Sequence, residues 1–185
     1  MEILNYIQYN SILILSYFFI SFIALILSMM TNKQSNDLLF SSYRSSLFNP
    51  LTYIRFFTHI LGHDNWRHFS SNFMIILLIG PMTEEKYGTI NLLIMILITA
   101  FITGIINSLV SKNKILGASG IAFMLIILSS FVNIETGKIP LTLILIFIFY
   151  IVNEILDGLF KKDNVSHLGH LIGAICGIIF GFYIK

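Results

Sequence analysis

Long apolar stretches alternate with polar segments along this chain. A helix needs about 20 apolar residues to cross the hydrocarbon core of a bilayer. Most of the apolar stretches approach that length, so the pattern predicts membrane-spanning helices joined by polar loops. We expect one longer polar segment, residues 31–66, to lie at the membrane interface, and we call it the interfacial segment. The six predicted helices cover approximately residues 8–30, 67–80, 89–110, 116–133, 139–157 and 165–184.

Composition supports this interpretation of the pattern. The chain has 185 residues, of which 56% are hydrophobic and 11% charged, and its mean hydropathy is +0.86. A soluble domain of this length could not bury so much apolar surface, so lipid is the expected solvent. In lipid every backbone polar group must be paired internally, which favours helices. We therefore predict an all-α polytopic membrane protein in which residues 1–185 form a single six-helix domain.

The sequence disfavours a cleaved signal peptide, a nucleic-acid-binding protein, and a disulfide or cysteine-based metal site. No Lys or Arg precedes the apolar run from Ile12 to Met30, and no A-x-A site follows it, so we expect a retained helix rather than a cleaved signal. The net charge is only +2 and the basic residues are dispersed, which disfavours nucleic acid as a partner. The single cysteine, Cys176, excludes an internal disulfide and disfavours a cysteine-based metal site.

The predicted topology gathers unusual polar residues at one membrane face. Helices two, four and six all begin at this face. Ser119 and His170 lie roughly 7–8 Å and 10 Å along helices four and six at 1.5 Å per residue, and His68 and Asn72 open helix two. These polar side chains should therefore converge at similar shallow depth. The connecting segments on this face are 31–66, 111–115 and 158–164.

Small residues suggest how helices four and six meet. Glycine recurs every four residues along helix six, which makes one smooth stripe on a helix, and His170 lies beside its upper end. Small residues at this spacing let two membrane helices approach closely. Helix four opens with small residues and is the expected partner. The residues are Gly169, Gly173, Gly177 and Gly181 on helix six, and Gly117, Ala118 and Gly120 on helix four.

A serine that meets a histidine in this way could act as a nucleophile. A serine hydroxyl needs a base within about 2.6–3.2 Å to take its proton, and His170 could supply it. The amide groups at the start of helix four suit a developing oxyanion. The structural alternatives are a serine that only packs between helices and a buried histidine that only bonds a neighbour. Both alternatives become considerably weaker when the two residues are considered together, at the same face and depth.

Three motifs in order resemble those of the rhomboid intramembrane serine proteases. The resemblance covers about residues 50–185, and the six-helix layout agrees with it. The motifs are H-x4-H-x3-N at His63, His68 and Asn72, followed by the glycine and acidic residue of GPMTEEKYG; G-x-S-G from Gly117 to Gly120; and H-x2-G-x3-G at His170, Gly173 and Gly177.

The resemblance implies a role for each of these residues. Ser119 would be the nucleophile, and His170 the general base and then the general acid. The oxyanion would be bound by His68, Asn72 and the backbone N–H of Ser119. The implied supporting residues are His63, Gly117, Gly120, Gly173, Gly177 and Phe123, the last of which would pack on the catalytic histidine.

The resemblance also implies the setting of the reaction. No cofactor and no metal would be required. The partners would be transmembrane protein substrates and the lipid bilayer, with no nucleic acid, and a monomer would suffice. We expect a multi-pass protein of a bacterial cell membrane that cleaves transmembrane segments.

Some assignments have alternatives. His167 could replace His170 as the base, but only His170 keeps both glycines of the motif. An inactive client-binding rhomboid relative would be expected to lack Ser119 or His170. A metal-dependent enzyme or transporter using His59, His63 and His68 would lack an obvious carboxylate partner. A purely structural membrane scaffold is the remaining alternative.

Loop charges conflict with the orientation that the resemblance implies. Lys and Arg accumulate in cytoplasmic loops. Eight of them lie on the face of Ser119 and three on the other face, which favours a cytoplasmic site, whereas bacterial six-helix rhomboids usually have it outside. Four of the eight lie within residues 31–67, and without them the count is four to three. We therefore expect the family orientation, with a cytoplasmic C-terminus.

Overall fold

A computed structural model describes residues 9–134, 138–152, 156 and 167–184 of the chain. The described part is helical and contains no named strand, only an isolated antiparallel bridge between Ser42 and Ile115. The predicted all-α class is confirmed. The helices are α1 (Ile12–Met30), α2 (Gln34–Leu39), α3 (Pro50–Thr58), the 3₁₀ turn η2 (His59–Leu61), α4 (Trp66–Tyr87), α5 (Thr89–Val110), α6 (Ser119–Ser129), α7 (Leu141–Ile146), the π-helical turn η3 (Phe147–Ile151) and α9 (His167–Tyr183).

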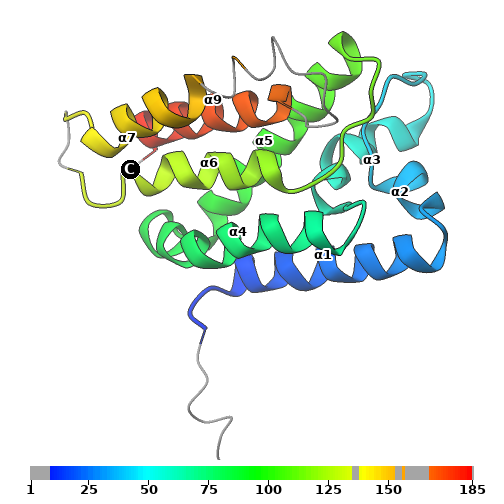
Figure 1. Ribbon diagram of the computed structural model, residues 1–185, viewed down its shortest axis with the longest axis horizontal. Helices are drawn as coiled ribbons and strands as arrows, with labels where there is room; N and C mark the ends of the chain where they lie inside the picture. Colours follow the sequence, from blue (N-terminus) through cyan, green and yellow to red (C-terminus); the bar gives the residue numbers. More distant parts are fainter. Residues whose placement is uncertain (1–8, 135–137, 153–155, 157–166, 185) are drawn as a thin grey trace, which may run out of the picture.

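The longer helices pack side by side. Helix α1 lies against α4, α4 against α6, and α6 against α9, while α5 runs obliquely and contacts α4, α6 and α9 (Figure 1). Helices α2 and α3 lie together at one end, where α3 packs on α5. Helix α6 is the central element, and most of its side chains are buried. The candidate site is built around the first residues of this central helix.

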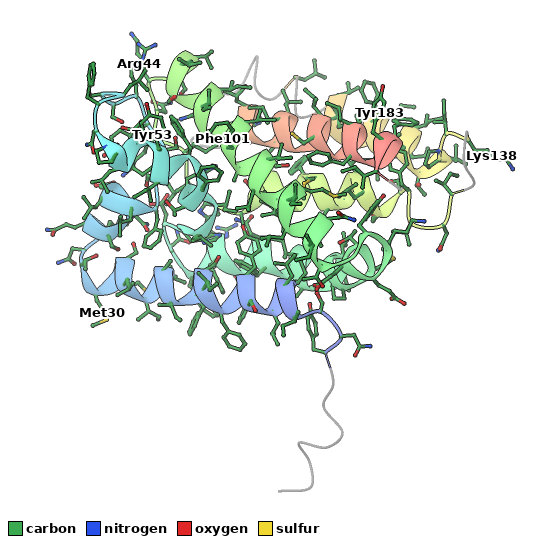
Figure 2. All side chains as sticks on the ribbon, turned by 180° about the vertical axis from the view of Figure 1, so that it is seen from behind. Met30, Arg44, Tyr53, Phe101, Lys138 and Tyr183 are labelled. Atoms are coloured by element: carbon green, nitrogen blue, oxygen red, sulfur yellow. The ribbon has the colours of Figure 1, made fainter. Side chains whose placement is uncertain are left out.

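Two helices among the described residues, α1 and α5, are long and apolar enough to cross a membrane, whereas α6 and α9 are apolar but shorter. Large apolar side chains cover the outside of the bundle, among them Met30 of α1 and Tyr183 of α9, which are 76% and 83% exposed (Figure 2). Such a surface suits a lipid environment. The arrangement with six spans remains a prediction.

The end of the second predicted helix was placed too early, at residue 80. Helix α4 continues through Pro81 to Tyr87, and Thr83, Glu84 and Tyr87 in its last turns are buried. Glu84 is buried and accepts hydrogen bonds from the Ser11 hydroxyl and from the backbone N–H groups of Leu13 and Ile14. A carboxylate at a helix N-terminus satisfies unpaired amides. This cap also explains why α1 begins at Ile12 rather than at residue 8.

The fourth predicted helix, 116–133, is shorter in the structure. Helix α6 begins at Ser119 and ends at Ser129, so Ser119 is its first residue rather than 7–8 Å along it. The preceding residues are not helical, and Ile115 among them forms two 2.9 Å backbone hydrogen bonds with Ser42. The fifth predicted helix, 139–157, begins with α7 and η3, and its last residues lie largely outside the described residues, as do residues 165–166 before α9.

Candidate active site

The loop before Ser119 needs a glycine at position 117. Gly117 has a φ of +122°, a conformation that side chains disfavour. A Cβ atom at this position would lie 2.7 Å from His68 Nε2, so the space is also closed. The N–H of Gly117 donates to the carbonyl of His59 at 2.9 Å. The glycine therefore lets the chain turn into α6 close to His68, with Ser119 at the helix N-terminus.

Backbone contact between α6 and α9 determines where His170 lies. A Cβ atom at Gly173 would lie 2.0 Å from the carbonyl oxygen of Gly120, and one at Gly120 would lie 3.0 Å from that of Gly169. A Cβ atom at Gly177 would lie 2.8 Å from the carbonyl oxygen of Met124. The glycine stripe thus packs on α6, the predicted partner. His170 follows Gly169 directly, and Ser119 precedes Gly120, so the contact brings their backbones together.

The His170 ring is held by an aromatic neighbour. Phe123 of α6 stacks on it with ring centroids 4.3 Å apart and an interplanar angle of 10°. His167 lies edge-on to His170, with centroids 6.4 Å apart. The stacking restricts rotation of the imidazole. His170 therefore contacts α6, the helix that begins with Ser119, through the Phe123 side chain.

His68 and Asn72 lie one turn apart on α4 and both face the start of α6. The Asn65 side chain caps α4 by accepting from the His68 backbone N–H at 2.9 Å. A Cβ atom at Gly117 would lie 2.7 Å from His68 Nε2 and 3.6 Å from Asn72 Nδ2. Two polar side chains therefore reach the backbone just before Ser119. Asn72 is buried.

His63 connects these groups. It is fully buried, and its Nε2 atom lies 3.2 Å from Asn72 Nδ2 and 3.4 Å from the backbone nitrogen of Ala118. Its Nδ1 atom lies 3.2 Å from the carbonyl oxygen of Leu61. Burial, with a smaller contribution from His68, lowers the pKa of His63 to about 3, and burial lowers the pKa of His59 to about 4. Both imidazoles are therefore neutral near pH 7.

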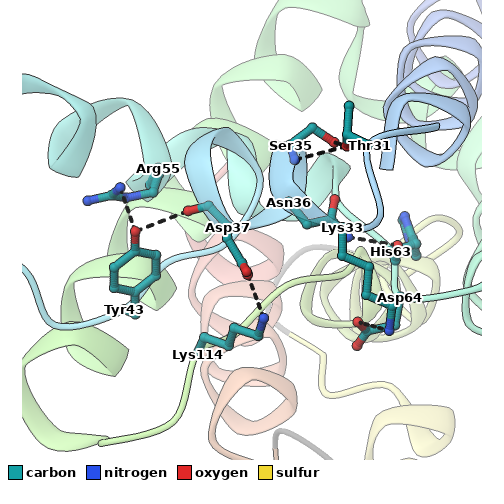
Figure 3. Close-up of polar contacts among 10 residues, drawn as sticks. All are labelled: Thr31, Lys33, Ser35, Asn36, Asp37, Tyr43, Arg55, His63, Asp64 and Lys114. Carbon is teal, nitrogen blue, oxygen red and sulfur yellow. Dashed lines mark hydrogen bonds and ion pairs between the residues drawn. The ribbon is translucent and has the colours of Figure 1, made fainter. Parts of the chain in front are cut away.

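Polar contacts of the interfacial segment hold this end of the molecule (Figure 3). The Asn36 side chain donates to the carbonyl oxygen of His63 at 3.0 Å. Two exposed ion pairs join Lys33 to Asp64 at 3.3 Å and Lys114 to Asp37 at 2.5 Å. These contacts thus link the beginning of the segment to its end, which precedes α4, and to the loop that precedes α6.

Sequence reasoning missed one residue that supports this loop. The Asn107 side chain, buried on α5, donates to the carbonyl oxygens of Ser42 at 3.2 Å and Asn113 at 3.0 Å. Ser42 in turn donates its hydroxyl to the carbonyl oxygen of Gly104 at 3.1 Å. An asparagine inside an otherwise apolar helix was the available signal, because an amide in such a place needs polar partners.

The predicted site residues meet at one open cavity of about 980 Å³. Asp64 and Lys112 also line it, which makes part of its wall charged. Among the described residues, no three His, Cys, Asp or Glu side chains form a group that could hold a metal ion. The polar lining of the cavity includes the hydroxyl of Ser119, the imidazoles of His68 and His170 and the amide of Asn72. The predicted residues that line it are His68, Asn72, Ser119, Phe123 and His170, together with His167.

Comparison with known families shows which family the chain belongs to. The profile of the Rhomboid domain matches residues 50–185, most of the chain. The chain belongs to the rhomboid family. Members of this family are membrane proteins, which agrees with the apolar surface. The matched residues of this rhomboid include every helix from α3 onward and every residue of the candidate site.

Relatives of this rhomboid occur in plants and bacteria. It is 26% identical over 140 residues to Rhomboid-like protein 11, chloroplastic, of Arabidopsis thaliana, covering 68% of this chain and 50% of that protein. It is 24% identical over 131 residues to the Rhomboid protease GlpG of Haemophilus influenzae, covering 69% and 68%. RHOMBOID-like protein 1 of Arabidopsis thaliana is 32% identical over 134 residues, covering 69% and 33%. The chain therefore spans half or less of the two plant relatives.

Proposed function

We propose that this rhomboid is an intramembrane serine endopeptidase that cleaves transmembrane segments with Ser119 and His170. The observation that carries the proposal is that both residues line one open cavity, while backbone contact between α6 and α9 brings their positions together. The relative named as a protease, GlpG of Haemophilus influenzae, supports it. The substrates would be transmembrane proteins of a bacterial cell membrane, and a monomer with six spans would suffice.

The reaction begins with proton transfer from the serine. A neutral His170 ring nitrogen takes the Ser119 hydroxyl proton while the oxygen attacks the scissile carbonyl carbon. The carbonyl π electrons move to its oxygen, which becomes the oxyanion. Stacking on Phe123 keeps the imidazole in one plane, so that the ring need not reorient as it becomes charged.

Three donors would stabilise the oxyanion. They are a ring N–H of His68, an amide N–H of Asn72 and the backbone N–H of Ser119. Donors that are already in place before the reaction stabilise developing charge at little reorganisation cost. His68 and Asn72 both face the backbone at Gly117, two residues before the nucleophile, which supports this role for them.

Three further proton transfers complete the cycle. The imidazolium of His170 gives its proton to the leaving amine as the C–N bond breaks, which leaves an acyl-enzyme on Ser119. A water molecule from the open cavity then loses a proton to His170 and attacks the ester carbonyl. The proton returns to Ser119 as the acid product leaves. No cofactor takes part in this scheme.

The test is fluorophosphonate labelling of membranes that contain wild type or Ser119→Ala at matched expression, followed by cleavage of a transmembrane substrate in liposomes. We expect wild type to label and cleave, and Ser119→Ala to do neither. Equal labelling of the two proteins would contradict the proposal. A folded, inserted wild type that neither labels nor cleaves would instead favour a client-binding protein without protease activity.

A further inference from the structure

We propose that His63 is a positioning residue for the oxyanion site, and that it acts through Asn72 and the backbone before Ser119. The inference rests on the proposed protease function and extends it to a residue that does not line the cavity. His63 lies in the connection between η2 and α4 and is fully buried. It cannot touch a substrate in that place, so any effect it has on the reaction must pass through its neighbours.

The contacts of His63 require one tautomer. Its Nε2 atom faces the side-chain nitrogen of Asn72 at 3.2 Å and the backbone nitrogen of Ala118 at 3.4 Å. The backbone nitrogen can only donate, so Nε2 must carry the lone pair. Its Nδ1 atom faces the carbonyl oxygen of Leu61, which can only accept, so Nδ1 carries the hydrogen. The neutral ring with hydrogen on Nδ1 satisfies all three contacts.

This tautomer determines which atom Asn72 offers to the cavity. An amide nitrogen has two hydrogens, and here one of them is directed to His63. The other remains for an oxyanion. If the lone pair at Nε2 were lost, the Asn72 amide could turn over and present its oxygen, which would repel the developing negative charge. His63 therefore selects the catalytically useful orientation of Asn72.

The second contact steadies the serine itself. Ala118 directly precedes Ser119 and is its helix cap residue, with no side-chain hydrogen bond of its own at the helix N-terminus. Its N–H is directed at His63, and the neighbouring N–H of Gly117 at the carbonyl of His59. Two successive amides are thus held by the end of the interfacial segment. Their position determines where the backbone N–H of Ser119 points.

The His63 ring is held firmly enough to position its neighbours. Phe69 and Phe73 of α4 pack on it with centroids 5.3 Å and 5.7 Å away, and His68 lies 5.0 Å away. The carbonyl of His63 accepts from Asn36 at 3.0 Å. Phe69 and Phe73 of α4 therefore restrain the ring, and Asn36 of α2 restrains the backbone of His63. The fixed ring in turn fixes the positions of Asn72 and Ala118.

The experiment is a double-mutant cycle for cleavage of a transmembrane substrate in liposomes. We expect His63→Leu to lower kcat about 10- to 30-fold with KM within about two-fold, less than the loss expected for removal of an oxyanion donor. His63→Gln, whose carbonyl can accept in place of Nε2, should stay within about five-fold of wild type. The double variant His63→Leu/Asn72→Ala should be slower than Asn72→Ala alone by clearly less than the factor for His63→Leu in wild type, because the part of the effect that passes through Asn72 is already lost.

His59 provides the matched control. Its ring is also buried in this segment, but the ring hydrogen bonds to the carbonyl oxygen of Arg55 and not to a site residue. The effects of His59→Leu and Asn72→Ala on kcat should therefore multiply. If the effects of His63→Leu and Asn72→Ala also multiply, or if His63→Leu leaves kcat intact, the inference is overturned.

Two outcomes need a separate measurement. If His63→Leu does not fold, His63→Phe takes its place in the cycle, because phenylalanine keeps a flat ring but has no lone pair. The same results would then support or overturn the inference. Failure of the proposed function is distinguishable, because wild type would then show no cleavage that depends on Ser119. A wild type that cleaves through Ser119 while the cycle is multiplicative overturns only the role of His63.

Discussion

The α6–α9 contact and the interfacial segment both support the candidate site, but by different forces. At the α6–α9 contact, glycines bring two backbones together, and the fit is steric. The interfacial segment instead holds the loop before Ser119 through backbone hydrogen bonds between Ser42 and Ile115 and through hydrogen bonds that His59 and His63 accept. The α6–α9 contact tolerates almost no added side-chain volume, whereas the hydrogen bonds of the interfacial segment can be removed one at a time. Substitutions at the α6–α9 contact should therefore have larger effects than the loss of one hydrogen bond in the interfacial segment.

The largest effect is expected at the chemistry on the α6–α9 contact. His170→Ala should lower kcat/KM at least about 1,000-fold, because the serine loses its base. His167→Ala is the matched control on the same helix and should stay within about ten-fold of wild type, since Phe123 stacks on the His170 ring. Cleavage kinetics in liposomes measure both. The reverse ranking would assign the base to His167.

Added methyl groups should next separate the two helices in a graded way. Gly173→Ala should destabilise the fold by about 2–4 kcal/mol and lower kcat at least about 100-fold, because its Cβ would overlap a backbone carbonyl. Gly120→Ala, whose Cβ would lie 3.0 Å from the nearest atom, should cost less than about 1.5 kcal/mol. Unfolding in mixed micelles and kcat test the ranking. Equal effects of the two variants would argue against steric control.

Acid should destabilise the protein through the buried histidines of the interfacial segment, and it should not affect the α6–α9 contact. The folded pKa values of His63 and His59 are lowered to about 3 and 4, below the ordinary value of about 6.5. The unfolded chain therefore binds more protons below pH 6.5. The free energy of unfolding should be constant above pH 7 and then fall by up to about 1.4 kcal/mol per pH unit for each histidine, down toward pH 4.

Unfolding of wild type at pH 7.5, 6 and 5 measures this slope. His59→Gln removes one of the titrating groups and should make the slope shallower. A slope that His59→Gln leaves unchanged would show that other groups cause the acid sensitivity. Gly120→Ala should shift the whole curve without changing its slope, because no titrating group is involved.

A smaller effect is expected when one hydrogen-bonding side chain that holds the loop before α6 is removed. Asn107→Ala removes one donor to each of the carbonyl oxygens of Ser42 and Asn113, while the Ser42 carbonyl keeps its hydrogen bond from the Ile115 N–H. We expect a loss of about 1–2 kcal/mol of stability and a fall in kcat of about three- to ten-fold. The same unfolding and cleavage assays apply. A loss of kcat as large as that of Gly173→Ala would remove the distinction between the two regions.

The smallest effect is expected at the exposed ion pairs. Lys114→Gln breaks the pair with Asp37, and both side chains are about half exposed. Solvent and salt screen such pairs, so the change in stability should be less than about 0.5 kcal/mol, with kcat within about two-fold. A large effect that disappears at high salt would instead show that this pair takes part in holding the loop.

Local patterns predicted much of the site and part of the fold. Each predicted apolar stretch contains a described helix, and the glycine stripe on helix six predicted its contact with helix four. These features depend on composition and on helical spacing, which neighbouring residues encode. The catalytic roles of Ser119 and His170 remain predictions, supported by the cavity that they share.

Contacts between distant residues could not be predicted in this way. Glu84 extends α4 because it caps a helix about 70 positions earlier in the chain. Ser119 begins α6, rather than lying within it, because Ile115 pairs with Ser42. His63 was predicted only as a supporting residue, and its partners became visible once Ala118, 55 positions later, lay against its ring.

The sequence by itself therefore determined the helical class, the apolar surface and the residue types of the candidate site. These follow from hydropathy and from periodicity along a single helix. Only the tertiary structure decided where α4 and α6 begin and end, and which hydrogen-bond partners His63 and Asn107 have. The physical reason is that a buried polar group must be paired, and its partner is chosen by the packing of elements that are far apart in the chain.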